Sequence, residues 1–162
     1  MDPSPSLRWQ TRRFRELDLD ALYAVLRLRA EVFVVEQRCA YLDPDGKDRH
    51  PDALHLLGLA ADGALAAYLR ILPAGVSYPE PSIGRVVTAP GHRGRGLGDP
   101  LLREALREIE RRWPGTDVRI GAQAHLGDYY GRHGFVADSE PYLEDGIAHI
   151  DMMRRAGGES SP

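Results

Sequence analysis

The sequence has 162 residues but only one cysteine, Cys39, and it contains no long apolar run. A single cysteine excludes an internal disulfide and any zinc site built from cysteines. An excess of one charge is also lacking, because 21 lysines and arginines stand against 24 aspartates and glutamates, for a formal net charge of -3. Without a basic surplus or an apolar segment of about 20 residues, we expect neither a nucleic acid nor a membrane as a partner.

Residues 1–6 lack both the basic start and the apolar centre of a secretory signal. We therefore expect a cytoplasmic protein. The length, together with 43% hydrophobic and 28% charged residues, is typical of one globular domain. We expect this domain to span residues 1–162, with an ordered core over about residues 7–155 and short frayed ends.

Hydrophobic patterning predicts strands and helices in mixed order along the chain. Strand-like segments lie at residues 9–14, 54–60, 64–72, 83–88, 118–123 and 146–153, and helical spacing is found at about 18–36, 97–113 and 126–133. Asp62-Gly63 between two of the strands is typical of an antiparallel hairpin. The helix between strands 83–88 and 118–123 predicts that these two strands run parallel, in a sheet with helices on its faces.

Residues 37–53 interrupt this pattern with a polar segment that is rich in carboxylates. Asp43 and Asp45 have the spacing of a calcium loop, but glycine follows Asp45 directly and the next alternate position holds no third ligand. His125 and His149 also lack a third ligand at a recognisable spacing. We therefore expect a solvated acidic loop and no metal site.

A glycine-rich loop with two arginines joins the strand at 83–88 to the longest helix. Unpaired amides at a helix start, together with the positive end of the helix dipole, favour an anion such as a phosphate. A dinucleotide fingerprint would need glycine where Asp99 stands, and an ATPase loop would need a lysine after Gly96, where Leu97 stands. The loop alone leaves two interpretations open, a different phosphate loop or a plain connection with solvated arginines.

The pattern Arg93-x-x-Gly96-x-Gly98 resembles the acetyl-CoA pyrophosphate loop of the GNAT superfamily of N-acetyltransferases. Downstream, Tyr129-Tyr130-x-x-x-Gly134-Phe135 is similar to a second signature of that superfamily. Longer segments, at residues 32–37, 45–48, 121–126 and 142–147, resemble its ElaA-like branch, and the resemblance covers about residues 8–154.

The resemblance implies an α/β (α+β) fold with a mixed, mostly antiparallel sheet, a central parallel pair of strands and helices on both faces. It also implies acetyl-CoA as cosubstrate, no metal, and transfer of the acetyl group to a primary amine by direct attack in a ternary complex. The residues implied in binding the cosubstrate are Val86, Val87, Thr88, Arg93, Gly94, Arg95, Gly96, Leu97, Gly98, Gln123 and Tyr130. Gln123 stands where many relatives carry an asparagine.

Acyl transfer to an amine needs a proton for the departing thiolate, polarisation of the carbonyl, and a base for the amine. Tyr130 matches the general acid of the family, while Tyr129 suits a core role with its hydroxyl bonded to the backbone. A bulge in the strand at Val86, Val87 and Thr88 would free amides for the carbonyl. The candidates for the base or the acceptor site are Glu36, His125, Glu144 and His149, with a water chain as an alternative.

The acceptor itself is not specified by the sequence. Carboxylates at residues 43–52 and near Glu140 and Glu144 favour a cationic amine, such as a polyamine, an amino sugar or lysine. The acceptor can be a small molecule or a protein. The sequence is also compatible with a homodimer of this chain. The alternative function is a catalytically inactive CoA-binding sensor or interaction module, although such a protein would not need Tyr130.

Overall fold

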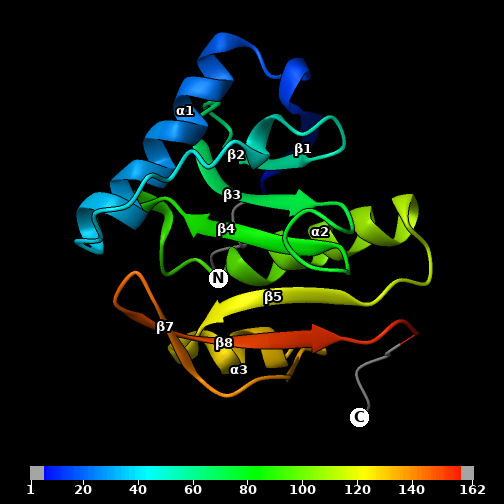
Figure 1. Cartoon of the computed structure of the whole chain (residues 1–162). Helices are drawn as coiled ribbons and strands as arrows, with labels where there is room; N and C mark the ends of the chain where they lie inside the picture. Colours follow the sequence, from blue (N-terminus) through cyan, green and yellow to red (C-terminus); the bar gives the residue numbers. More distant parts are fainter. Residues whose placement is uncertain (1–5, 158–162) are drawn as a thin grey trace.

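A mixed sheet runs through the described part of the chain, residues 6–157 of the computed structural model. The frayed ends expected at residues 1–5 and 158–162 lie outside the described residues. The strand order is β1-β2-β3-β4-β5-β8-β6, with β7 beside β8 (Figure 1). The strands are β1 (Arg8–Arg13), β2 (Leu54–Leu59), β3 (Leu65–Leu72), β4 (Ser82–Thr88), β5 (Val118–Gln123), β6 (Val136–Ala137), β7 (Tyr142–Glu144) and β8 (Ile147–Arg154).

The α-helices of the described residues are α1 (Leu19–Arg29), α2 (Gly98–Arg112) and α3 (Gly127–Gly131). The first was expected to continue to Glu36, but from Ala30 the chain forms a π-helix, η2 (Ala30–Glu36). Its wider turn is seen in the bond from the Gln37 amide to the Val32 carbonyl, five residues back, at 3.0 Å. Short 3₁₀ turns lie at η1 (Phe14–Glu16), η3 (Lys47–Arg49), η4 (Pro90–His92) and η5 (Ala124–Leu126). π-Helical turns are rare in proteins, and those that occur are often found at functional sites.

Local sequence chemistry explains where most of these elements begin and end. The side chain of Asp18 accepts a hydrogen bond from the Ala21 amide at 2.7 Å and so caps α1. The predicted hairpin is confirmed, since β2 pairs antiparallel with β3 and Gly63 takes the positive φ of 86° that its turn requires. Strands β6 and β7 were not predicted, because two or three mostly exposed residues carry no readable periodicity.

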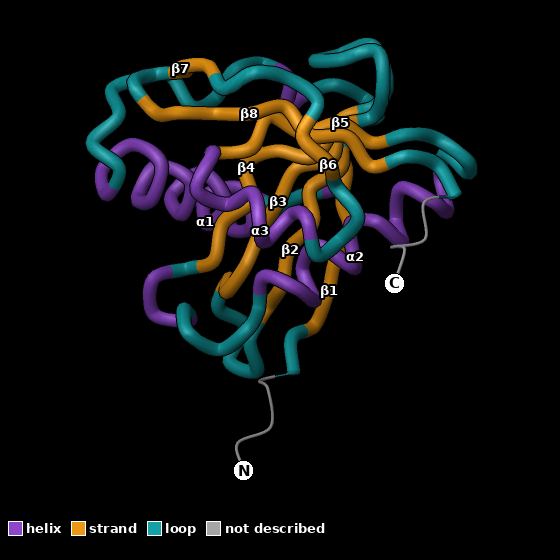
Figure 2. The backbone as a smooth tube through the Cα atoms, turned by 90° about the horizontal axis from the view of Figure 1, so that it is seen from below, coloured by secondary structure: helices purple, strands orange, loops and turns teal. Residues whose placement is uncertain are grey.

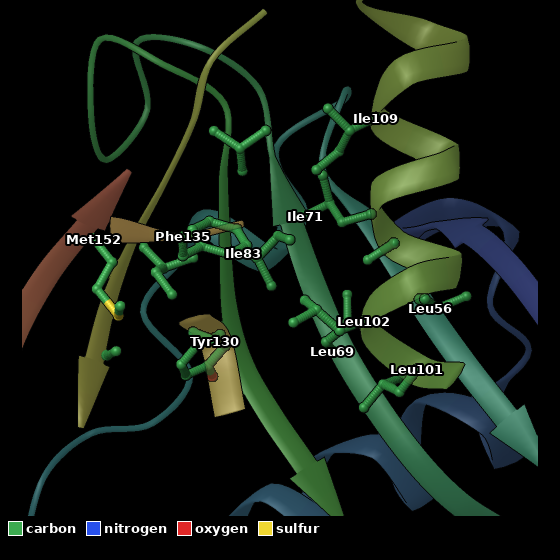
Figure 3. Close-up of a cluster of buried hydrophobic side chains, with 14 of the residues drawn as sticks. Leu56, Leu69, Ile71, Ile83, Leu101, Leu102, Ile109, Tyr130, Phe135 and Met152 are labelled. Atoms are coloured by element: carbon green, nitrogen blue, oxygen red, sulfur yellow. The ribbon is translucent and has the colours of Figure 1, made fainter. Parts of the chain in front are cut away.

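Alternating side chains of the central strands pack against helices on the two faces of the sheet. Leu56 and Leu69 belong to a core with α2 and with Tyr130 of α3 (Figure 3). Leu57 and Tyr68 belong to a second core with α1. In Figure 2 the strands accordingly lie between α1 on one side and α2 on the other. The predicted mixed sheet with helices on both faces is confirmed.

The parallel pair β4 and β5 is joined over a very short length. Ser82 pairs with Arg119, and the Arg119 amide donates to the Pro81 carbonyl at 3.0 Å, but no later residue of β4 pairs with β5 within residues 6–157. The two strands therefore separate toward their carboxyl ends (Figure 1). Backbone groups on the facing edges of the diverging strands are left without a partner strand, so an extended ligand can enter between them.

Candidate active site

A cleft of about 540 Å³ opens where β4 and β5 separate. It is lined by residues of both strands, of η2, of the β7–β8 hairpin and of α3, including Val86, Gln123, Tyr130, Glu144 and His149. The structure thus brings together five of the residues singled out from the sequence. His125, in contrast, is an exposed residue of η5 and does not line the cleft.

Strand β4 carries the bulge that the resemblance implied, one residue earlier than expected. Between the pairs Arg70–Gly84 and Tyr68–Val87, the two residues Arg85 and Val86 oppose the single residue Leu69. Arg85 has a positive φ of 54°, a backbone conformation that is unfavourable for a residue with a side chain. Bulges and residues in such conformations are both over-represented beside active sites. A residue in a bulge leaves the ladder, so its backbone polar groups are available to a ligand.

Val87 and Thr88 lie beyond the bulge and pair regularly with β3. The Ala89 amide donates to the Ala66 carbonyl at 2.8 Å, so the alternation of an antiparallel strand turns the Thr88 amide toward the opposite edge. That edge faces the cleft. The Val87 side chain packs in the α1 core, and the same alternation turns its backbone groups toward β3, so Val87 offers no group to a ligand.

The glycine-rich loop between η4 and α2 presents a run of unpaired amides. In the described part of the chain, the N–H groups of residues 94–99 donate to no carbonyl or side chain. Gly94 and Gly96 have φ values of 77° and 70°, and nothing lies within 4 Å of where a Cβ would stand on either. These donors surround the first turn of α2, where the helix dipole favours an anion. The loop therefore fits a pyrophosphate group.

Tyr129 and Tyr130 differ in what their hydroxyls contact. The Tyr129 hydroxyl donates to the Gly98 carbonyl at 2.6 Å, which ties α3 to the start of α2. The Tyr130 ring is buried in the α2 core, but its hydroxyl has no hydrogen-bond partner among residues 6–157 and the residue lines the cleft. Burial raises the pKa of Tyr130 well above its usual range, so the phenol keeps its proton at neutral pH.

Two contacts are made by side chains at the end of η2. Glu36 accepts two hydrogen bonds from the Arg93 guanidinium, at 2.7 and 2.9 Å, and Gln37 accepts one from the Gln123 amide at 3.3 Å. The bond to Arg93 lowers the pKa of Glu36, which makes this carboxylate a weaker base than an isolated one. Glu36 therefore lies beside the glycine-rich loop and outside the lining of the cleft.

The acidic loop is only partly solvated, contrary to expectation: Asp43 and Asp48 are buried, while Asp45 and Asp52 are exposed. Arg29, which is fully buried, binds Asp43 and Asp48 at 2.7 Å each, and Arg70 binds Asp45 and Asp48 at 2.8 and 2.9 Å. Arg85 completes the group through Asp43, at 2.8 Å. We call these six residues the arginine–aspartate cluster. Their carboxylates are already paired, so they do not supply the free negative charge that was expected to attract a cationic acceptor.

The family is decided by comparison with known proteins. A family model described as "Acetyltransferase (GNAT) domain" matches residues 44–156. The chain belongs to the GNAT acetyltransferase family. The ElaA protein of Escherichia coli is 43% identical over 148 residues, covering 91% of this chain and 96% of that protein. A UPF0039 protein of Synechocystis is 42% identical over 149 residues, covering 92% and 96%.

Solved GNAT structures agree with the fold described above. A crystal structure titled as an acyl-CoA N-acyltransferase from Pseudomonas aeruginosa superposes with a TM-score of 0.87 at 50% identity, covering 92% of this chain and 99% of that one. The crystal structure of E. coli ElaA gives 0.86 at 42% identity, with the same coverage. None of the helices described in this GNAT chain is long and apolar enough to cross a membrane.

Several residues of the GNAT cleft were not identified from the sequence. Tyr78 and Tyr142 lie over Gly121, where a Cβ would come within 2.8 and 3.0 Å of their hydroxyls, and both hydroxyls donate to Asp151. Gln37 and Tyr142 fall in segments that resembled the ElaA-like branch, which was the available signal. Tyr78 comes from the β3–β4 connection, and no pattern there pointed to the cleft.

Proposed function

We propose that this GNAT protein transfers an acetyl group from acetyl-CoA to a primary amine, by direct attack within a ternary complex. The observation that carries the proposal is Tyr130, whose ring is buried while its protonated hydroxyl lies at the cleft between β4 and β5 without a hydrogen-bond partner among residues 6–157. A module that only binds CoA would not need a proton donor at this place. An acid that protonates a thiolate needs such a group.

Different groups of the chain would bind different parts of acetyl-CoA along the cleft. The amides of residues 94–99 would hold the pyrophosphate, with positive charge from Arg93 and Arg95. The edge of β4 at Val86 and Thr88 would bond the pantetheine arm and polarise the thioester carbonyl as its oxygen gains negative charge. The Gln123 amide, now bonded to Gln37, could bond the same arm from the β5 side.

In the chemical step the amine nitrogen bonds to the carbonyl carbon and the carbon–sulfur bond breaks. Tyr130 gives its proton to the departing sulfur, so that neutral thiol leaves. Within this scheme the thioester lies in the gap between the two strands, where the Tyr130 hydroxyl reaches it from the α2 face. Burial helps twice, because it keeps the phenol protonated and strengthens its bond to a developing thiolate.

The test is turnover of acetyl-CoA, measured as release of free thiol, with a panel of primary amines that includes a polyamine, an amino sugar and a lysine peptide. We expect amine-dependent thiol release with at least one class, and acetylated product by mass spectrometry. Thermal stabilisation by CoA without turnover of any amine would instead support the alternative, a CoA-binding sensor. The two functions are thus separated by one pair of measurements.

A further inference from the structure

The base was left open among four residues, and the structure separates them by position. Glu36 is engaged by Arg93, and His125 lies outside the cleft. His149 and Glu144 both line it, on the hairpin formed by β7 and β8. The exposed side chain of Glu144 reaches to 3.7 Å from Nε2 of His149, which is itself largely buried. His149 is therefore the titratable group held in place where the β7–β8 hairpin lines the cleft.

The backbone fixes which nitrogen of His149 carries the proton. Nδ1 lies 2.8 Å from the Ile147 carbonyl, which can only accept, so Nδ1 must be the protonated nitrogen of the neutral ring. Nε2 is then left with its lone pair free. The Tyr142 ring stacks on the imidazole with centroids 5.9 Å apart, and the Tyr142 hydroxyl is bonded to Asp151 at 2.7 Å. A ring fixed in this tautomer and orientation is ready to accept a proton at Nε2.

His149 and Tyr130 approach the gap from opposite faces of the sheet. His149 is the cross-strand partner of Gln123, so the two side chains share a face, and Gln123 donates to Gln37 at the end of η2, which continues α1. Tyr130 belongs to the core on the other face, with α2. The attacking nitrogen and the departing sulfur lie on different sides of the carbonyl carbon, so a base and an acid on opposite faces suit this geometry.

We propose that Nε2 of His149 is the general base of the transfer, an inference that rests on the proposed function. As the carbon–nitrogen bond forms and the carbon–sulfur bond breaks, Nε2 takes the proton that the nitrogen loses. Tyr130 protonates the thiolate, and the proton on His149 returns through water to the Tyr130 phenolate. Amine and acetyl-CoA are thereby converted to amide and CoA with every proton accounted for.

The charged and titratable groups around His149 fit this role. Glu144 and Tyr142 face it from β7, Asp145 follows in the turn, and Asp151 reaches it only through Tyr142. On the β5 side its partner Gln123 carries no charge. Glu144 can therefore stabilise the imidazolium that forms when Nε2 accepts the proton, and no cation of the described chain is paired with it.

The test compares His149→Asn with the parent protein in the amine assay described above. Asparagine can still donate from the Nδ1 position to the Ile147 carbonyl but has no base at Nε2. We expect kcat to fall by on the order of 100-fold at pH 7, with the melting temperature near that of the parent. The acid-side limb of the kcat profile against pH should also disappear. His149→Gln should show the same loss, and His125→Asn, outside the cleft, should behave as the parent.

An active parent with an unchanged kcat and pH profile in His149→Asn would overturn the assignment and leave the proposed function standing. A loss that is equal at every pH, with the acid limb retained, would make His149 structural and also overturn it. If the parent protein acetylates no amine of the panel, the proposed function is wrong, and the assignment of His149 fails together with it. The three results are distinguishable from the same set of profiles.

Discussion

Two polar regions flank β4, and they differ in how their polar groups are partnered. In the arginine–aspartate cluster each of the six side chains has an oppositely charged partner, although Asp45 is exposed and Nε of Arg70 is buried without a hydrogen-bond partner among the described residues. The open donors, by which we mean the amides of residues 94–99 and the Tyr130 hydroxyl, have no partner of either kind among residues 6–157. Charge alone therefore does not mark a ligand site in this protein, because charged side chains can be neutralised by one another, whereas the open donors are free to bond a ligand.

Removing a member of the arginine–aspartate cluster should have the largest effect on stability. Arg29→Met leaves the buried carboxylates of Asp43 and Asp48 without their main partner, and we expect a loss of about 3–5 kcal/mol in the free energy of unfolding. Urea denaturation measures it. The control is Arg107→Met, because Arg107 forms an exposed pair with Glu104 and should cost less than about 1 kcal/mol. Equal losses of unfolding free energy in the two variants would show that the ion pairs of the cluster stabilise the fold no more than an exposed pair does.

Removing the open donor at Tyr130 should instead slow the chemical step of the reaction. Tyr130→Phe deletes a hydroxyl that has no hydrogen-bond partner within the described residues, so stability should change little, while kcat should fall by on the order of 100-fold. Acetyl-CoA dissociation should hardly change, because the acid acts as charge builds on sulfur. Tyr129→Phe is the matched control, since it loses the bond to Gly98, costs about 1 kcal/mol of stability and leaves the chemical step intact. Single-turnover rates compare the two, and a parent-like rate for Tyr130→Phe would remove it from the mechanism.

The cluster also predicts how stability depends on pH. Burial raises the pKa of Asp45, but hydrogen bonds and charge from Arg70, and the charge of Arg85, outweigh it and lower the pKa to about 2. The folded value lies below the unfolded one, so this stabilisation of about 1–2 kcal/mol is present above pH 4 and is lost as the pH falls toward 2. Asp45→Asn should flatten that slope in acid unfolding. The exposed residue Asp52, changed to Asn, should leave the slope as it is.

A charge placed among the loop amides should weaken binding of acetyl-CoA. Gly96 has a positive φ, and Gly96→Glu adds both backbone strain and a negative side chain where the pyrophosphate is expected. We expect the dissociation constant to rise by about tenfold or more, equivalent to at least about 1.4 kcal/mol. Gly63→Glu, at another positive φ in the β2–β3 turn, controls for strain alone. Unchanged affinity in a folded Gly96→Glu protein would refute the loop assignment.

We expect the smallest effect, on the affinity for acetyl-CoA, from changing Glu36, the carboxylate that contacts Arg93 beside the open donors. Glu36→Gln removes the charge that holds Arg93, so the guanidinium becomes free for the pyrophosphate, and acetyl-CoA should bind a few-fold more tightly at low salt. Glu110→Gln makes the same change of charge on an exposed part of α2 and should not alter binding. Titration at two salt concentrations distinguishes them. Weaker binding in Glu36→Gln would mean that Glu36 positions Arg93 for the ligand.

The fold was largely predictable because its signals are local. The hairpin turn at Gly63 and the periodicity of α2 act within a few residues, and each appears where it was expected. The π-helix at η2 was not predictable, since its apolar spacing is read equally well as an α-helix. The short strands β6 and β7 form only because β8 is there to pair with them.

The candidate site was predictable in part, for a different physical reason. The resemblance to GNAT motifs pointed to Tyr130 and the glycine-rich loop, because each motif lies within one short segment of the sequence. Pairing between distant segments has no such signal, so the sequence did not show that Glu36 meets Arg93, 57 residues away. Burial of Asp43 and Asp48 also depends on Arg29 from a different element, and the same letters in isolation indicate a solvated loop.

The bond between the Tyr129 hydroxyl and the Gly98 carbonyl has a consequence for how the two ends of the candidate site are joined. Gly98 ends the glycine-rich loop, and Tyr129 precedes the proposed acid, so this contact ties the loop to the helix that carries Tyr130. The approach is close, because a Cβ at position 98 would stand 3.1 Å from the Tyr129 ring. A side chain at position 98 would therefore push the loop and α3 apart.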